Sequence, residues 1–230
     1  DAPHRAALLV ALRRPEPSVR IAALRTLHSL ASAFDDVRAA VIGTLDDPDA
    51  GVREAALDVL RALGPEPWKA PSASRDVLLL RLARWTEEPV EGDATVVLDL
   101  CRALPPDARP VDVLARLLVS DAVSEAAMTL AQGVPDETAA ALRRLVAGDD
   151  VLLAARTLRA LLVRDLREPL PEHLGAWIES DDQRVARAAS VAAALALPGS
   201  IAPFGGALAR AARAGKPGVA YPACCALDRL

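Results

Sequence analysis

Apolar residues recur along the chain at helical spacing, and one block of them is repeated. Residues 19–27 read VRIAALRTL and residues 52–60 read VREAALDVL, an offset of 33 residues that matches a valine, an arginine, two alanines and two leucines. Residues three and four positions apart fall on one face of a helix. Weaker copies keep this period and begin at Asp93, Val123, Val151, Val185 and Val219. The pattern predicts a tandem array of similar helical units.

A second apolar helical segment precedes each copy, so each unit is expected to be a helical hairpin. These segments are residues 4–13, 36–45, 74–85, 110–119, 137–146, 172–180 and 204–214. Side chains that can accept hydrogen bonds from helix N-terminal amides stand before the repeated helices, as N-cap candidates. They are Ser18, Asp49, Asp93, Asp121, Asp150 and Asp182. Glycines near the predicted helix ends support the same division, because glycine commonly terminates helices.

Small residues occupy the same two positions in successive hairpins. They are Ala22, Ala23, Ala55, Ala56, Ala126, Ala127, Ala154, Ala155, Ala188 and Ala189. A methyl-sized side chain lets a neighbouring helix approach closely, so we expect these alanines at the contacts between hairpins. A single hairpin has too little core to be stable alone, and its apolar face must be covered by the next hairpin.

The expected fold is therefore all-α, an α-solenoid of about seven stacked hairpins that form one curved domain over residues 1–230. The approximate repeats are 1–33, 34–64, 65–104, 105–133, 134–166, 167–198 and 199–230. The chain is also consistent with being part of a longer protein.

An acid-rich turn followed by V-R-x-A-A-L-x-x-L resembles the HEAT-like repeat family, in particular the short bacterial form also found in phycobilisome lyases. The resemblance is most specific over residues 16–63 and extends to residues 121–197. It implies an interaction scaffold in which the second helix of each hairpin lines the concave side. It also implies that Arg20 and Arg53, directly after the repeat valine, are structural and brace the turns, where loop acids lie within reach.

Composition narrows the classes of function. Hydrophobic residues make up 52% of the chain and charged residues 25%, whereas aromatics are only 3%, which favours a folded helical protein. The net charge is −4, so the surface as a whole repels a phosphate backbone and nucleic acid is disfavoured as a partner. Basic residues are almost all arginine and asparagine is absent, which indicates a bacterial genome rich in GC.

Compartment and cysteine chemistry follow from what the sequence lacks. No apolar run reaches the roughly 20 residues that cross a bilayer, and no signal peptide is evident, so the expected location is cytoplasmic. Cys101, Cys224 and Cys225 form no CxxC spacing and their number is odd, so they are expected to be buried free thiols.

The repeated helices predict one polar stripe of mixed charge, formed by side chains two, six and nine positions after the repeat valine. Its principal members are Arg25, His28, Glu54, Asp58, Arg61, Asp99 and Arg102. Such a surface suits a protein or peptide partner, or another segment of a longer chain. The same polarity is also explained by solvent exposure alone. Trp68, on the proline-rich insertion of residues 64–71, is a further candidate contact, unless its indole simply packs on the stack.

Catalysis has little support in the sequence. His4, His28 and His173 lie far apart and in no ligand spacing, so neither a metal, a cofactor nor a catalytic group is expected. The enzymatic alternative is a HEAT-like DNA glycosylase or another nucleic-acid-acting enzyme of this fold, for which Trp85, Trp177 and several acidic residues would be candidates. A basic, Trp-lined groove would favour that alternative.

Overall fold

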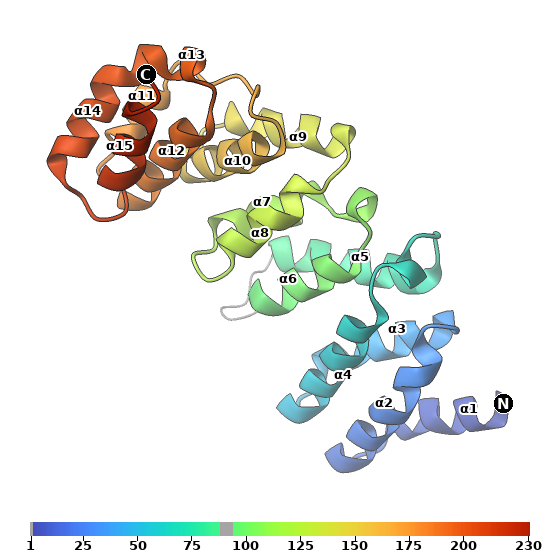
Figure 1. Ribbon diagram of the computed structural model, residues 1–230. Helices are drawn as coiled ribbons and strands as arrows, with labels where there is room; N and C mark the ends of the chain where they lie inside the picture. The colour runs from blue at the N-terminus through green and yellow to red at the C-terminus, as the bar shows by residue number, and fades with distance from the viewer. Residues whose placement is uncertain (1, 88–93) are drawn as a thin grey trace. The chain divides into compact units, whose positions relative to one another are not determined.

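The computed structural model of the protein describes residues 2–87 and 94–230 (Figure 1). The chain divides into two compact units, Asp1–Val113 and Leu114–Leu230, called here the first and second units. The described residues are helical and contain no strand. The candidate N-cap Asp93 lies outside the described residues.

The first unit is built from helical hairpins that follow one another in chain order. Its elements are α1 (Ala2–Ala11), α2 (Pro17–Ala31), α3 (Asp35–Gly43), η1 (Thr44–Asp46), α4 (Ala50–Leu63), η2 (Glu66–Trp68), α5 (Ala73–Glu87), α6 (Ala94–Ala103) and η3 (Pro106–Ala108). The second helices α2, α4 and α6 pack side by side, and the first helices α3 and α5 do the same. This is the packing of a helical repeat solenoid.

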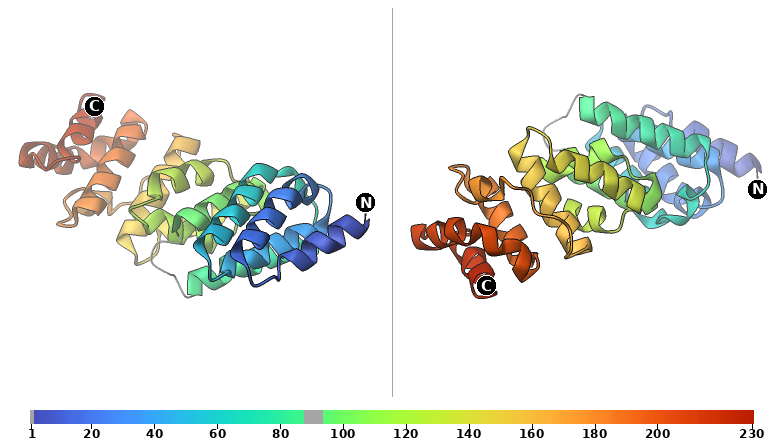
Figure 2. Two further views of the ribbon diagram at one scale, coloured as in Figure 1. Left: turned by 90° about the horizontal axis from the view of Figure 1, so that it is seen from below. Right: turned by 90° about the horizontal axis from the view of Figure 1, so that it is seen from above.

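The second unit repeats this arrangement. The chain enters it through α7 (Val111–Val119), and the remaining elements are α8 (Ser124–Gln132), α9 (Asp136–Val146), α10 (Val151–Arg164), α11 (Leu174–Ile178), α12 (Gln183–Leu195), α13 (Pro198–Ile201), η4 (Ala202–Phe204), α14 (Gly205–Ala214) and α15 (Ala220–Leu227). Helices α8, α10, α12 and α15 form the row of second helices, and α14 packs on α11 (Figure 2). The all-α solenoid fold predicted from the sequence is thus confirmed within each unit.

Three of the expected N-caps act as such. Asp49, Asp150 and Asp182 accept hydrogen bonds from the amides of Val52, Leu153 and Arg184 at 3.1, 3.0 and 2.9 Å. The expectation for Ser18 is wrong, because α2 begins one residue earlier, at Pro17, after an extended Glu16. Proline suits the first turn of a helix, since its ring fixes a helical φ and its missing N–H needs no partner. Asp121 is not a cap either; its carboxylate pairs with Arg156.

The interfaces between hairpins are lined by alanine, as the repeat predicts, with one exception. Ala23, Ala56, Ala127, Ala154, Ala155, Ala188 and Ala189 are buried, and Ala55 and Ala126 are half-buried. Ala22 is exposed, although it corresponds to Ala188 in the repeat. Its side of α2 would face an earlier second helix, and none precedes α2 among the described residues. The expected role of Ala22 in packing is therefore wrong, while the rule holds where a neighbour is present.

This difference in burial predicts that leucine in place of alanine destabilises the protein at one of the two corresponding positions and has little effect at the other. Ala188→Leu should destabilise the second unit by about 1–3 kcal/mol, because the added methylenes have no space between α12 and its neighbours. Ala22→Leu should change stability by less than about 0.5 kcal/mol, as expected for an exposed site. Chemical denaturation of both variants measures the difference. Equal destabilisation would contradict the packing role.

The cysteines differ from expectation in part. Cys101 is completely buried on α6, where burial raises the pKa of its thiol to about 12. Cys224, however, is exposed and Cys225 is half-buried. Both lie on α15, whose buried residues face α12 and α14 and whose other face no described helix covers.

Candidate functional site

The seven stripe residues predicted from the repeat lie on three adjacent second helices of the first unit. Arg25 and His28 are on α2, Glu54, Asp58 and Arg61 on α4, and Asp99 and Arg102 on α6. We call this set the second-helix surface. All its members are exposed except Asp99, which is half-buried. On α4 the polar members recur at helical spacing, and the opposite face of the helix buries Val52, Ala56, Leu57, Val59 and Leu60.

An ion-pair network centred on Arg61 joins α4 to α6. The guanidinium of Arg61 donates to Asp99 Oδ2 from Nε at 3.0 Å and from Nη2 at 2.8 Å. Its Nη1 donates to Glu54 and Asp58, each at 3.1 Å. Arg102 donates to the other oxygen of Asp99 at 3.1 Å. These carboxylates raise the pKa of Arg61, and the hydrogen bond to Asp99 has the largest effect. Sequence spacing places the residues of α4 on one face, but only the packing of α4 on α6 brings Asp99 to Arg61.

The network leaves the α4–α6 part of the surface slightly acidic, since three carboxylates surround two guanidinium groups. The α2 part is different. Arg25 and His28 border a hollow of about 520 Å³ together with Glu54 and Asp58, and no ion pair to either is found among the described residues. The charged groups on α4 and α6 are therefore already paired with one another, whereas Arg25 and His28 on α2 remain available to donate hydrogen bonds.

Arg20 and Arg53 make the same two bonds to their own turns. Arg20 Nη1 donates to the carbonyls of Arg14 and Pro15, and Arg53 Nη1 donates to those of Asp47 and Pro48, which are offset by the repeat length. Arg20 also pairs with Asp47 of the following hairpin at 2.8 Å and is 8% exposed. This pair, with burial opposing it, lowers the pKa of Asp47. Arg20 thus links two hairpins, whereas Arg53 remains exposed.

Trp68 is not available as a partner contact, and that expectation is corrected. Its side chain is 0% exposed, and the guanidinium of Arg38 lies 5.7 Å from the centre of its ring. The buried Arg38 is itself held by Asp35 at 2.8 Å and by Ser74 at 3.1 Å. The insertion therefore folds inward, with η2 carrying the indole into the core of the first unit.

The cluster around Asp35 predicts a pH effect. The hydroxyl of Ser74 donates to Asp35 at 2.5 Å and is the main reason why the pKa of Asp35 falls from 3.8 to about 2. A carboxyl whose pKa is lower in the folded state stabilises the fold above its unfolded pKa, and this stabilisation is lost as the pH falls through the folded pKa. Asp35→Asn should therefore lose less thermal stability than wild type between about pH 4 and pH 2. Melting followed by circular dichroism tests this, with the more exposed Asp36→Asn as control.

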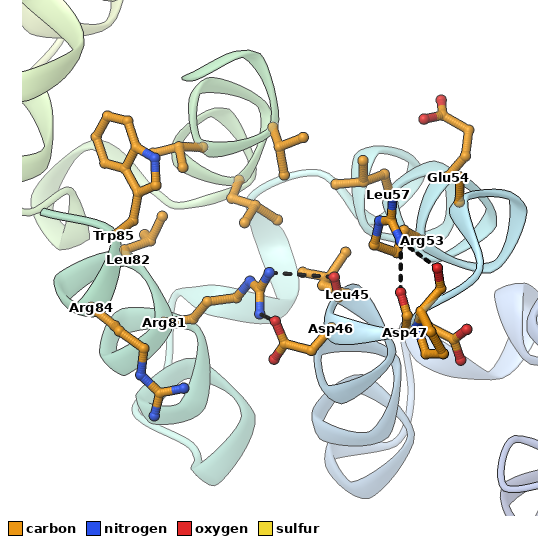
Figure 3. Close-up of a pocket in the computed structure, with 15 residues that line it drawn as sticks. Leu45, Asp46, Asp47, Arg53, Glu54, Leu57, Arg81, Leu82, Arg84 and Trp85 are labelled. Carbon is orange, nitrogen blue, oxygen red and sulfur yellow. Dashed lines mark hydrogen bonds and ion pairs between the residues drawn. The ribbon is translucent and has the colours of Figure 1, made fainter. Parts of the chain in front are cut away.

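A groove of about 740 Å³ lies between α4, α5 and α6 (Figure 3). Its apolar lining includes Leu57, Leu82, Trp85, Val97 and Leu100, and Arg53, Arg81 and Arg84 stand around it. No local sequence pattern predicts this groove, because its walls come from α4, α5, α6 and η1, which meet only in the fold.

No three histidine, cysteine, aspartate or glutamate side chains of residues 2–87 and 94–230 converge to hold a metal ion. No described helix is both long enough and apolar enough to cross a bilayer. Trp85 and Trp177, the candidates of the enzymatic alternative, are 9% and 5% exposed, and Trp177 packs edge-on against His173 at 4.6 Å between ring centres.

Comparisons with known proteins give one family. Residues 5–99 match the family described as HEAT repeats. No curated protein matches the chain. Similar solved structures include an engineered protein at 16% identity, covering 98% of this chain and 96% of that chain with a TM-score of 0.41. A second engineered protein has 20% identity, coverages of 98% and 67% and a TM-score of 0.43. A designed armadillo repeat protein has 15% identity, coverages of 97% and 98% and a TM-score of 0.35. The resemblance to HEAT-like repeats seen in the sequence is thus supported over residues 5–99.

Proposed function

We propose that the protein is a noncatalytic scaffold whose second-helix surface binds a protein or peptide partner, or another segment of a longer chain, on the concave side of the stack. The observation that carries the proposal is the exposed network around Arg61, continuous with the available donors Arg25 and His28. A surface with both signs of charge in fixed positions selects a partner of complementary pattern. Because the side chains of the network are already held by one another, little conformational entropy is lost when they meet a partner.

The alternation of charge also bears on the nucleic-acid alternative. A duplex-binding groove neutralises phosphates with an excess of cations. On α4 and α6, each arginine of the surface is hydrogen-bonded to a carboxylate. This pairing favours a protein or peptide partner over a nucleic acid.

The double variant Arg61→Glu with Arg102→Glu tests the proposal. It should lose the partner that wild type retains in affinity capture from the native cell extract, because the two reversals turn a surface of mixed charge into a strongly acidic one and remove the charge pattern that the partner matches. Circular dichroism should show an unchanged helix content, since exposed ion pairs contribute only about 0–1 kcal/mol each.

A matched control keeps the total charge change the same. Arg13→Glu with Arg144→Glu places two reversals at exposed positions outside the second helices, on the α1–α2 connection and on α9. This control should retain the partner. Equal retention by all three proteins, with the fold intact, would show that the second-helix surface is not the binding surface.

A further inference from the structure

The groove between α4, α5 and α6 has an apolar lining. Trp85 and Leu82 line it from α5 and Leu57 from α4 (Figure 3). Val96 and Val97 line it from α6. Leu82 is completely buried and Trp85 is 9% exposed, while Val96 is half-buried. At about 740 Å³ the groove is large enough for a bulky side chain and part of its backbone.

Each carboxylate of the groove already has an arginine partner. The pairs are Asp46 with Arg81 at 2.5 Å, Asp47 with Arg20 at 2.8 Å and Glu54 with Arg61 at 3.1 Å. Two of these three arginines, Arg20 and Arg61, stand outside the lining of the groove. Asp46 and Asp47 are therefore compensated, whereas Glu54 shares Arg61 with Asp58 and Asp99 of the second-helix surface.

Two cations of the groove have no such partner. Arg84 forms no ion pair with any carboxylate of residues 2–87 and 94–230, and its side chain is exposed beside Arg81 on α5 (Figure 3). Arg53 donates only to the carbonyls of Asp47 and Pro48 within the same part of the chain. Among the described residues, the groove thus has an arginine without an ion-pair partner on each side, Arg53 on α4 and Arg84 on α5.

The wall of the groove also holds a donor without an acceptor. The indole N–H of Trp85 is buried and makes no hydrogen bond to the described residues. Its ring nitrogen faces the apolar side chains that line the groove (Figure 3). A buried donor left without a partner is unfavourable, and a small turn of the ring toward a carbonyl or carboxylate in the groove would supply an acceptor.

We infer that this groove is a docking site for an acidic peptide segment of a partner protein, with one bulky apolar side chain inserted between Trp85 and Leu57 and flanking carboxylates on Arg53 and Arg84. The charge selects the acidic segment, the apolar lining selects the large side chain, and the indole N–H takes a peptide oxygen. This inference does not depend on binding at the second-helix surface.

A peptide array on the intact chain tests the specificity. The probes are hexapeptides whose flanking positions are acidic and whose one central position runs through the natural amino acids. Binding should be strongest with leucine, isoleucine, phenylalanine, methionine or tryptophan at the centre and weak with glycine or lysine. Binding that ignores the central residue, or that is absent from the whole array, would overturn the inference.

Site-directed variants then locate the binding, using the labelled leucine hexapeptide in fluorescence anisotropy. Arg84→Glu should weaken binding at least about tenfold, because it places a carboxylate where the peptide needs a cation. Val96→Trp, which fills the groove, should weaken it similarly. Arg144→Glu, at an exposed position on α9, should bind as wild type does.

The outcomes separate this inference from the proposed function. Loss of the peptide in Arg84→Glu, together with a partner retained by the Arg61 and Arg102 double variant, would keep the groove and reject the second-helix surface. Equal weakening by Arg84→Glu and Arg144→Glu would overturn the groove as the site. Tighter binding to phosphatidylglycerol vesicles than to any peptide would overturn the peptide as the occupant.

Discussion

Replacing Trp68 with alanine is expected to lower the free energy of unfolding of the first unit by about 3–5 kcal/mol, the range for removing a large buried aromatic ring. The indole is completely buried and supports Arg38, which in turn bonds to Asp35 and Ser74. Its loss would leave a cavity beneath a buried cation. Chemical denaturation followed by circular dichroism measures the effect.

Two further variants separate ring volume from other causes. The N–H of Trp68 makes no hydrogen bond to the described residues, so Trp68→Phe loses only part of the ring and should cost less than about 2 kcal/mol. Leu80→Ala, on the exposed face of α5, should cost less than about 0.5 kcal/mol, because Leu80 is 63% exposed. A Trp68→Ala variant as stable as Leu80→Ala would show that the insertion does not hold the hairpins together.

The burial of Trp68 could not be predicted from the sequence. Local spacing predicted the helices, because the repeat residues of α2 and α4 recur at helical period and α4 is capped by Asp49. Whether an aromatic residue in a proline-rich insertion faces solvent depends on Arg38, distant in sequence, and no local pattern encodes that contact. Burial of Trp68 follows from the tertiary packing of α3 and α5.

At the candidate site, likewise, contacts within one helix could be predicted from the sequence and contacts between helices could not. Helical period alone placed Glu54, Asp58 and Arg61 on one exposed face of α4, as the structure has them. The bond from Arg61 to Asp99 requires the register of α4 against α6, 38 residues apart in sequence. The groove was harder still to predict from the sequence, because its walls come from α4, α5, α6 and η1. Residues on one helix could thus be grouped from the sequence, and groupings across helices could not.

The two arginines of the repeat motif explain how one motif can have two energetic consequences. Arg20 and Arg53 hold their own turns by equivalent bonds to backbone carbonyls. Only Arg20 adds a carboxylate of the next hairpin, and the side chains of Arg20 and Asp47 are just 9% and 10% exposed. A buried guanidinium that loses its carboxylate remains charged and poorly solvated, which is costly. The position in the stack, more than the motif, therefore decides the contribution of each arginine.

Asp47→Ala should accordingly destabilise the first unit by about 3 kcal/mol, because it leaves Arg20 buried without its counter-ion. Adding Arg20→Met to Asp47→Ala should recover part of that loss, since the apolar side chain fills the site without a charge. Arg53→Met alone should cost less than about 1 kcal/mol, because the exposed guanidinium forms no ion pair in the described residues. Urea denaturation of the three variants gives the comparison. A double variant less stable than Asp47→Ala would mean that the carbonyl bonds of Arg20, and not its pairing with Asp47, hold the two hairpins together.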